Sequence, residues 1–228
     1  GVDYISKERR ALDLRSFSLE RMCVGDWPNP DEAADELIPL EQWRAGVDQA
    51  SSMLDPIAIG IDIAHDRSSA AIASAGWRPD GLLHVEVNDH RRGTGWLDDR
   101  LIDFARRQSP SMIVRDGKGP YWEPPEKLRP VPHAMSTEEY GSACAQFFDL
   151  ATEGKFRHLG SQELMAAIVG AETRPMGEAW GWGRKSSKVD ISPLVAATLA
   201  VWGALQQKKR SKGPLIALPG AGVLSLDG

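Results

Sequence analysis

The aspartate at position 62 occupies a setting in which a charged side chain is costly. It lies near the end of an apolar run, residues 56–64, whose period-two pattern predicts a β-strand with isoleucines on one face and Ala58, Gly60 and Asp62 on the other. An ionised carboxylate on such a strand needs a hydrogen-bond network or a cation. The small residues before it leave room beside its side chain. Asp62 is therefore a candidate cation ligand, and the simpler alternative is a strand-end acid bonded to backbone amides.

Two further aspartates end or begin apolar segments. Asp116 closes the predicted strand Met112–Asp116, and Asp190 stands just before the apolar stretch Ile191–Leu205, a predicted helix. Their simpler roles would be to open an Asp-Gly turn and to cap a helix. Acids at two strand ends and one helix start also suit a divalent-metal site, since carboxylate oxygens are ligands that Mg²⁺ and Mn²⁺ prefer. In phosphodiester hydrolysis two such ions, about 3.5–4 Å apart, activate a water and offset charge on the leaving oxygen.

Charged residues close to these acids form two groups. His65 and Asp66 follow the first acid directly, and Arg184, Lys185 and Lys188 precede the third. The first pair are candidate accessory ligands or proton-handling groups, with a solvated loop as the alternative. The basic group is a candidate contact for DNA phosphates, with a solvated turn as the alternative.

The elements that must position these residues follow a recognisable order. From residue 56 the pattern predicts three antiparallel strands, a helix, a parallel strand and further helices. In the third strand, Leu83, Val85 and Val87 alternate with polar residues, which predicts one solvated face. Ser136 and Glu139 form a capping box that opens a later helix. This order predicts an α/β fold with a ribonuclease H-like mixed sheet, three antiparallel strands plus parallel strands, flanked by helices.

The composition of the chain indicates three segments and narrows the class of protein. We expect a connector or arm over residues 1–55, the nuclease-like domain over residues 56–207, and a basic, then Gly/Pro-rich tail over residues 208–228. The net charge of −5 provides no global basic field for nucleic acid. Two cysteines, Cys23 and Cys144, without zinc-type spacing, fit a reducing, cytoplasmic setting. The longest apolar run is shorter than the ~20 residues that span a bilayer, so no membrane association is expected.

Three segments together resemble a known family. They are Ile61–Ile72, His84–His90 with Gly93–Trp96, and Val189–Ala200. They are similar to the nuclease domain of tailed-bacteriophage large terminase subunits, in particular those of phages that infect actinobacteria. The resemblance runs from about residue 55 to residue 205. It implies a ribonuclease H-like, Mg²⁺- or Mn²⁺-dependent endonuclease, with two ions, that cuts double-stranded phage DNA during packaging.

The resemblance also implies site residues and partners. By motif position the metal-binding and catalytic aspartates fall on Asp62, Asp116 and Asp190. The implied partners are the packaging ATPase domain, the small terminase subunit and the portal protein, in the cytoplasm of the bacterial host. No Gly-x-x-x-x-Gly-Lys-Ser/Thr loop occurs, so we expect this chain to lack the ATPase half. The loop after Asp116 is also more polar than the loops typical of these phages.

The sequence leaves other functions open. A junction resolvase or transposase-like nuclease would have the same fold, and a non-catalytic module could dock on DNA or on the portal. Sugar-kinase and actin-like ATPases have a related sheet, but they usually carry a Gly-rich phosphate loop after the first-strand acid. Here the residues that follow are Ala64–Ser68, without a glycine, which disfavours that class.

Overall fold

The fold is built on a six-stranded mixed sheet. The computed structural model describes residues 37–120 and 122–211, with side chains described as far as residue 207. The strands in spatial order are β5 (His133–Met135), β4 (Met112–Asp116), β1 (Ala58–Ile63), β2 (Ser69–Trp77), β3 (Leu83–Arg92) and β6 (Phe156–Arg157). β1, β2 and β3 pair antiparallel, whereas β4 pairs parallel with β1. This is the predicted ribonuclease H-like order.

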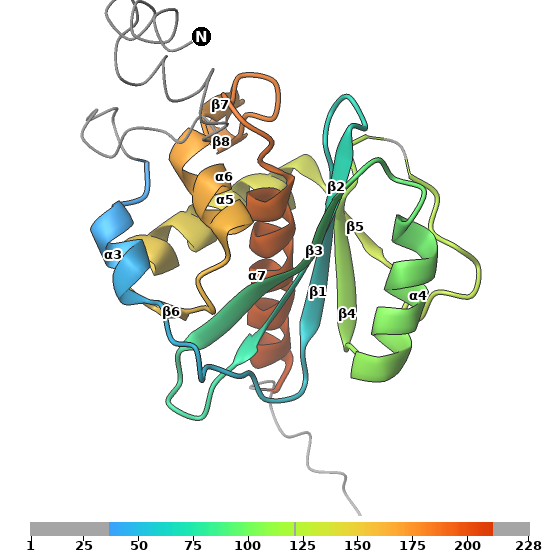
Figure 1. Cartoon of the computed structure of the whole chain (residues 1–228), viewed down its shortest axis with the longest axis horizontal. Helices are drawn as coiled ribbons and strands as arrows, with labels where there is room; N and C mark the ends of the chain where they lie inside the picture. Colours follow the sequence, from blue (N-terminus) through green and yellow to red (C-terminus); the bar gives the residue numbers. More distant parts are fainter. Residues whose placement is uncertain (1–36, 121, 212–228) are drawn as a thin grey trace, which may run out of the picture.

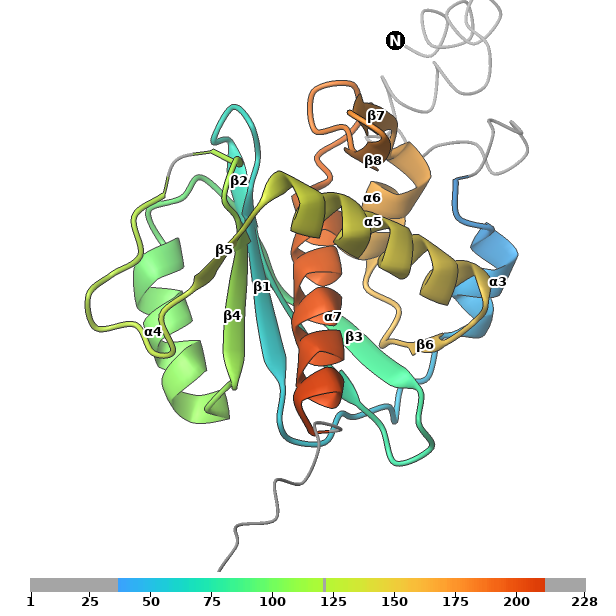
Figure 2. The same cartoon turned by 180° about the vertical axis from the view of Figure 1, so that it is seen from behind.

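Helices cover both faces of this sheet (Figures 1 and 2). α4 (Leu97–Gln108) packs on one face against the isoleucines of β1, and the opposite face is covered by α5 (Thr137–Thr152), α6 (Gln162–Gly170) and α7 (Ser192–Ser211). β1 is buried along its whole length because it lies between the two layers. A small hairpin, β7 (Thr173–Met176) and β8 (Ala179–Trp182), leads from α6 toward α7.

The start of the described chain packs onto this domain. α3 (Leu40–Ala45) places the buried Trp43 beside His158, with ring centroids 4.2 Å apart, and beside Phe147 and Phe156. The sequence predicts a short helix over Leu40–Arg44, and α3 confirms it. The remainder of the predicted connector includes residues 1–36, which lie outside the described residues.

The structure corrects three expectations from the sequence. α7 continues to Ser211, into the segment expected to be a tail, because Gln206 to Arg210 are good helix formers. The polar face of β3 is not simply solvated, since His84 is buried and hydrogen-bonds Ser51 at 2.7 Å. From the sequence, Asp89 in the same strand is most simply a surface acid, but in the structure it is buried and forms ion pairs with Arg91 and Arg100.

The capping box and the thiol of the later helix agree with the sequence. The capping box at Ser136 and Glu139 is present, and Cys144 is a buried free thiol. Residues 212–228 of the predicted tail lie outside the described residues. Within the described part of the chain, no helix combines the length and apolar character needed to cross a membrane.

Candidate metal and nucleic-acid site

The sheet places the first two aspartates side by side. β1 and β4 are parallel, and their register pairs Ile61 with Arg115, so the next positions, Asp62 and Asp116, are neighbours. The carboxyl ends of parallel strands meet at the same edge of a sheet, which is why two acids 54 positions apart in the sequence come together. Both are buried, with 3% and 7% of their surface exposed.

α7 brings the third aspartate to the same edge. Its backbone passes so close to β1 that a Cβ on Gly60 would lie 2.0 Å from the carbonyl oxygen of Ala196. The small residues before Asp62 therefore accommodate this helix, rather than leaving open space as the sequence suggested. Because α7 is fixed against β1, Asp190, two residues before the helix begins, borders the same pocket as Asp62.

Arg184 joins the first two acids. Its Nε and Nη2 donate to Asp62 Oδ2 and Oδ1 at 3.1 and 2.6 Å, and its Nη1 donates to Asp116 Oδ2 at 3.0 Å. The guanidinium carbon lies over the ring of Tyr140, 5.4 Å from its centroid. The Arg184 side chain is only 11% exposed. The sequence predicted a contact between Arg184 and DNA, but in this conformation the side chain points inward to carboxylates, and the DNA contact stays a prediction.

Asp190 has a different set of partners. Its Oδ2 accepts hydrogen bonds from the Ser69 hydroxyl and, at 2.8 Å, from His90 Nε2. Its Oδ1 accepts the backbone N–H of Ser192 at 2.9 Å, which is the helix-capping role that the sequence left as the simpler alternative. Asp116 likewise shows its predicted turn chemistry, because its Oδ1 accepts the N–H of Lys118 at 2.8 Å. Neither local role prevents a second role, since each carboxylate has lone pairs to spare.

The two environments shift the acids in opposite directions. Burial raises the pKa of Asp62 to about 6, although the ion pair with Arg184 works against this rise. Burial also acts to raise the pKa of Asp190, but the hydrogen bonds from His90, Ser69 and Ser192 outweigh it and hold that pKa below its usual range. Asp190 is therefore ionised at neutral pH.

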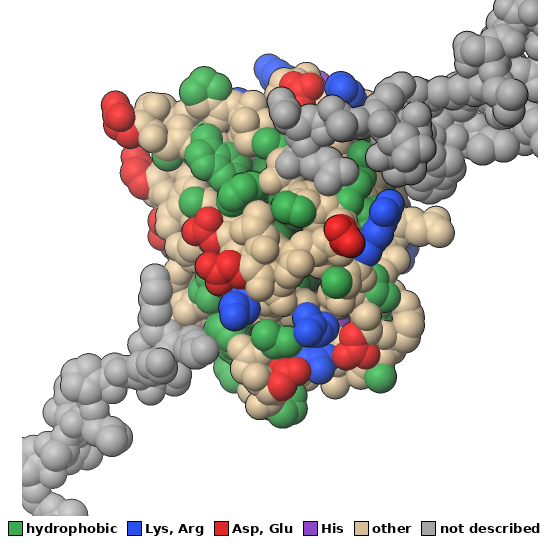
Figure 3. All heavy atoms as spheres, turned by 90° about the vertical axis from the view of Figure 1, so that its left-hand side faces the viewer, with side chains coloured by type: hydrophobic (Ala, Val, Ile, Leu, Met, Phe, Trp, Pro, Cys, Tyr) green, Lys and Arg blue, Asp and Glu red, His purple; other side chains and the backbone are tan. Residues whose placement is uncertain are grey.

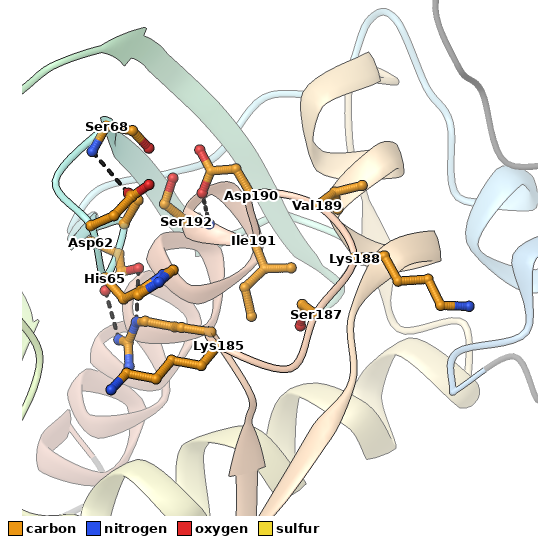
Figure 4. A pocket seen from close by; sticks show the side chains of 13 residues that line it. Asp62, His65, Ser68, Lys185, Ser187, Lys188, Val189, Asp190, Ile191 and Ser192 are labelled. Carbon is orange, nitrogen blue, oxygen red and sulfur yellow. Dashed lines mark hydrogen bonds and ion pairs between the residues drawn. The ribbon is translucent and has the colours of Figure 1, made fainter.

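The pocket beside these acids has a volume of about 240 Å³ (Figure 4). Its lining includes both predicted accessory residues, His65 and Asp66, and both predicted lysines, Lys185 and Lys188. Asp66 accepts the N–H of Ser68 at 3.0 Å, as expected of a solvated loop, and Lys188 extends away from the aspartates in Figure 4. The structure thus gathers every predicted site residue except Asp116 around one pocket, and Arg184 links Asp116 to it.

The acids suit a hard cation, but they do not form a complete cage. Three oxygens from Asp62 and Asp116 already converge on one positively charged group, which is the donor chemistry that Mg²⁺ or Mn²⁺ prefers. Among the described residues, however, no group of three or more His, Cys, Asp or Glu side chains is close enough to hold a metal ion. Asp190 has its own hydrogen-bond partners, Ser69, His90 and Ser192. The three-aspartate metal site stays a prediction, and its donor set fits the cation.

Sequence reasoning missed Ser69 and His90. In the sheet register Asp62 pairs with Ala71, and Ala71 pairs with His90, so these three residues form one row across the three strands. His90 could have been identified as a neighbour of Asp62 only if the register between these strands were known. A bulge between Ile72 and Ala73 shifts the pairing of β2 with β3 farther along the strands. The sequence alone contains no signal for that bulge.

Comparison with known proteins gives a structural match without a sequence match. No protein-family model matches the sequence, and no curated protein does. The crystal structure of the HK97 bacteriophage large terminase is similar, with a TM-score of 0.61 and 14% identity, over 74% of this chain and 43% of that chain. This chain thus spans less than half of the HK97 protein.

A second solved structure matches over nearly its whole length. The large terminase nuclease of the thermophilic phage G20c, with bound magnesium, is similar with a TM-score of 0.53 and 10% identity, over 74% of this chain and 97% of that chain. At such low identity the likeness concerns the fold. The resemblance seen in the sequence is confirmed at that level, and its actinobacteriophage detail stays a prediction. The chain therefore has the ribonuclease H-like fold of phage large terminase nucleases.

Proposed function

We propose that this protein is a metal-dependent endonuclease that cleaves double-stranded DNA, in the manner of a terminase nuclease during phage genome packaging. One observation carries the proposal: Asp62 and Asp116, buried at adjacent strand ends, converge on a single cationic group beside the pocket that Asp190 borders. Two buried carboxylates at this place would be costly to fold without a cation. The G20c nuclease, which has the same fold, was crystallised with magnesium.

The residues of the site would have different roles in this reaction. Divalent ions bound at the acids would activate a water and relieve charge on the phosphate that is cleaved. Asp62 and Asp116 would supply the oxygens that bind them, from strands whose pairing fixes the spacing between the two side chains. Asp190 would add a third carboxylate, which His90, Ser69 and the Ser192 N–H keep ionised and oriented. Lys185 and Lys188, on the pocket wall, would bind phosphates of the DNA.

The charge distribution favours weak binding with little sequence preference. The chain is net acidic, and on the face shown in Figure 3 basic and acidic side chains are interspersed rather than gathered in one broad basic patch. Affinity would then come from a few phosphate contacts and fall steeply with salt. A packaging ATPase domain, a small terminase subunit and a portal would hold the DNA and raise its local concentration at this site, in the cytoplasm of the bacterial host.

A plasmid assay tests the proposal. Purified protein should nick or linearise supercoiled DNA with Mn²⁺ or Mg²⁺, stop when EDTA is added, and resume when excess Mn²⁺ follows. The cut ends on a long duplex should show no dominant sequence. Cleavage that continues in chelator would reject metal-dependent hydrolysis, and selective cutting of four-way junctions over linear duplex would favour a resolvase.

A further inference from the structure

Arg184 links two of the candidate metal ligands through its side chain. Its three donating nitrogens satisfy both oxygens of Asp62 and one oxygen of Asp116. All three side chains are nearly enclosed, with exposed fractions of 11%, 2% and 5%. Among the described residues, no other Lys, Arg or His forms an ion pair with either of these two acids. Arg184 is therefore their cation in this conformation.

A divalent ion and this guanidinium would need the same oxygens. Mg²⁺ lies about 2.0–2.1 Å from its oxygen ligands, inside the volume that a bridging guanidinium fills. Both cations could not be held by Asp62 and Asp116 in this arrangement. Two ionised carboxylates carry two negative charges, which one guanidinium neutralises by half and one divalent ion neutralises fully. The ion therefore has the charge to displace the arginine, provided that the side chain has somewhere to go.

The turn that carries Arg184 is held by its own hydrogen bonds, so the Arg184 side chain could move without the backbone. The N–H groups of Ser186 and Ser187 and the Ser187 hydroxyl all donate to the carbonyl of Gly183, at 3.2, 2.9 and 2.7 Å. The Ser187 hydroxyl also accepts the N–H of Glu172 at 3.0 Å. This turn lines the pocket that holds Lys185 and Lys188. A displaced Arg184 side chain would thus enter the pocket, on the side where we propose that DNA phosphates bind.

We propose that Arg184 is a built-in counter-ion that holds Asp62 and Asp116 in the metal-free protein, and that divalent metal displaces it into the DNA-binding pocket. The metal would thereby create a phosphate contact that the metal-free protein lacks. This coupling would favour DNA binding by the metal-loaded protein. The inference rests on the proposed function, because it takes the two acids as metal ligands.

Mn²⁺ titration calorimetry without DNA tests the competition. Arg184→Ala should bind Mn²⁺ more tightly than the unaltered protein, because the apparent affinity of a site is reduced by the fraction of time in which it is blocked. If Arg184 occupies the acids about nine-tenths of the time, the gain is about tenfold. Lys185→Ala is the matched control, since it removes the same charge from the same pocket without touching either acid. It should change Mn²⁺ affinity far less.

Arg184→Lys keeps the competition test usable if the alanine variant does not fold. Lysine retains the charge but lacks the planar fork that binds two carboxylates, so it should compete less well and give an intermediate Mn²⁺ affinity. Equal Mn²⁺ affinity in the unaltered protein, Arg184→Lys and Lys185→Ala would overturn the inference while leaving the proposed function intact. Absence of Mn²⁺ binding in every variant would overturn both.

The salt dependence of DNA binding tests where the displaced side chain goes. The logarithm of DNA affinity falls with the logarithm of salt by about 0.9 for each phosphate contact. With Ca²⁺ in place of Mn²⁺ so that the duplex stays intact, Arg184→Ala should lower this slope by about 0.9. In EDTA the two proteins should have equal slopes. Equal slopes in both buffers, or the same loss in both, would contradict displacement toward DNA.

Discussion

The two sides of the candidate site satisfy buried acids in different ways. On the strand side, Asp62 and Asp116 depend on one charged partner, Arg184, which reaches them from a turn more than 60 positions away along the chain. On the helix side, Asp190 has uncharged donors, the Ser69 hydroxyl and the Ser192 N–H, together with His90. In our proposal the strand side exchanges Arg184 for a metal ion, whereas Asp190 on the helix side has hydrogen-bond donors that need carry no charge.

This difference suggests separate roles in metal binding: the strand side would provide the first ligands, and the helix side would orient the third. A carboxylate that is paired with one cation must exchange it for the metal ion, whereas a carboxylate that accepts hydrogen bonds still has lone pairs for the metal. A site with no partner at all would be costly to fold. In our proposal Arg184 offsets that cost in the metal-free protein and is then displaced by the metal ion. On the helix side, hydrogen bonds orient the Asp190 carboxylate before any metal binds.

Loss of Asp62 should have the largest effect. We expect Asp62→Asn to reduce plasmid cleavage to background, because even the loss of a residue that only supports a metal ligand costs about 10–100-fold. The protein should remain folded, since an uncharged amide is less costly than a carboxylate in this buried position. Cleavage and melting temperature measured together check both statements.

The control for this experiment is Asp99→Asn, which changes an exposed acid on α4. It should cleave and melt as the unaltered protein does. Cleavage at an unaltered rate by Asp62→Asn would show that Asp62 is purely structural, and the strand side would then differ from the helix side only in its choice of partner.

Loss of Arg184 should have the next largest effect, this time on stability. In metal-free buffer Arg184→Ala leaves two buried carboxylates without their charged partner, and breaking a buried pair in this way typically costs about 3–5 kcal/mol in the free energy of unfolding. Mn²⁺ should restore much of that loss because it supplies the missing charge. Urea denaturation in EDTA and in Mn²⁺ measures both quantities.

Arg106→Ala is a suitable comparison, because the Arg106 side chain is 79% exposed and pairs only at the surface with Asp103. Its melting temperature should not change in either buffer. A stable Arg184→Ala protein in EDTA would mean that the strand side does not need its cation.

The two sides should also show opposite pH dependence. The folded-state pKa of Asp62 lies above its ordinary value of 3.8, at about 6. As pH rises, Asp62 therefore loses its proton at a lower pH in the unfolded chain than in the folded protein. Asp62 therefore lowers stability progressively as pH rises from about 4 to about 6, by roughly 3 kcal/mol at about 1.4 kcal/mol for each pKa unit. The pKa of Asp190 is lowered in the folded state, so its contribution is present above about pH 4 and is lost as pH falls.

Difference curves isolate these two contributions. The stability of Asp62→Asn relative to the unaltered protein, in metal-free buffer, should increase between about pH 4 and pH 6. The stability of Asp190→Asn relative to the unaltered protein should be lowest above about pH 4 and should recover below it. Subtraction removes the contributions of carboxylates that the two proteins share. Parallel curves for the two variants would remove the distinction between the two sides.

Much of the fold was predictable because its signals are local. Period-two alternation over β1, the acids at the strand ends and the capping box at Ser136 each lie within a few residues of the feature that they predict. The order of three antiparallel strands, a helix and a parallel strand was enough to predict the ribonuclease H-like sheet, which the structure shows.

The candidate site was predictable only in part because its partners are distant in the sequence. Ser69 and Asp190 are 121 positions apart, and Arg184 and Asp62 are 122 apart. The alternation in β3 predicts a solvated side chain at His84, whereas its buried partner, Ser51, belongs to another part of the chain. Asp89 has its partner Arg100 on the following helix, α4. A basic residue before a helix looks the same in the sequence whether it points to solvent or to buried carboxylates. Only the fold decides between these two directions.

The smallest effect should come from His90, and it tests whether the helix side is oriented in advance. His90 Nε2 is 2.8 Å from Asp190 Oδ2, and because an ionised carboxylate can only accept, the imidazole N–H donates. His90→Ala should weaken cleavage by about tenfold, the lower end of the range for residues that orient a metal ligand. His90→Gln retains an N–H donor on a side chain of similar length and should recover part of that loss.

The readout that distinguishes orientation from general stability is Mn²⁺ dependence. If His90 only positions Asp190, excess Mn²⁺ should raise the cleavage rate of His90→Ala toward that of the unaltered protein, and its melting temperature in EDTA should stay close to that of the unaltered protein. Ser69 and the Ser192 N–H would still hold Asp190 in the variant, which is why the effect should be modest. A loss as large as that of Asp62→Asn, or one that the glutamine variant does not relieve, would show that Asp190 depends on a single partner, just as the strand side depends on Arg184.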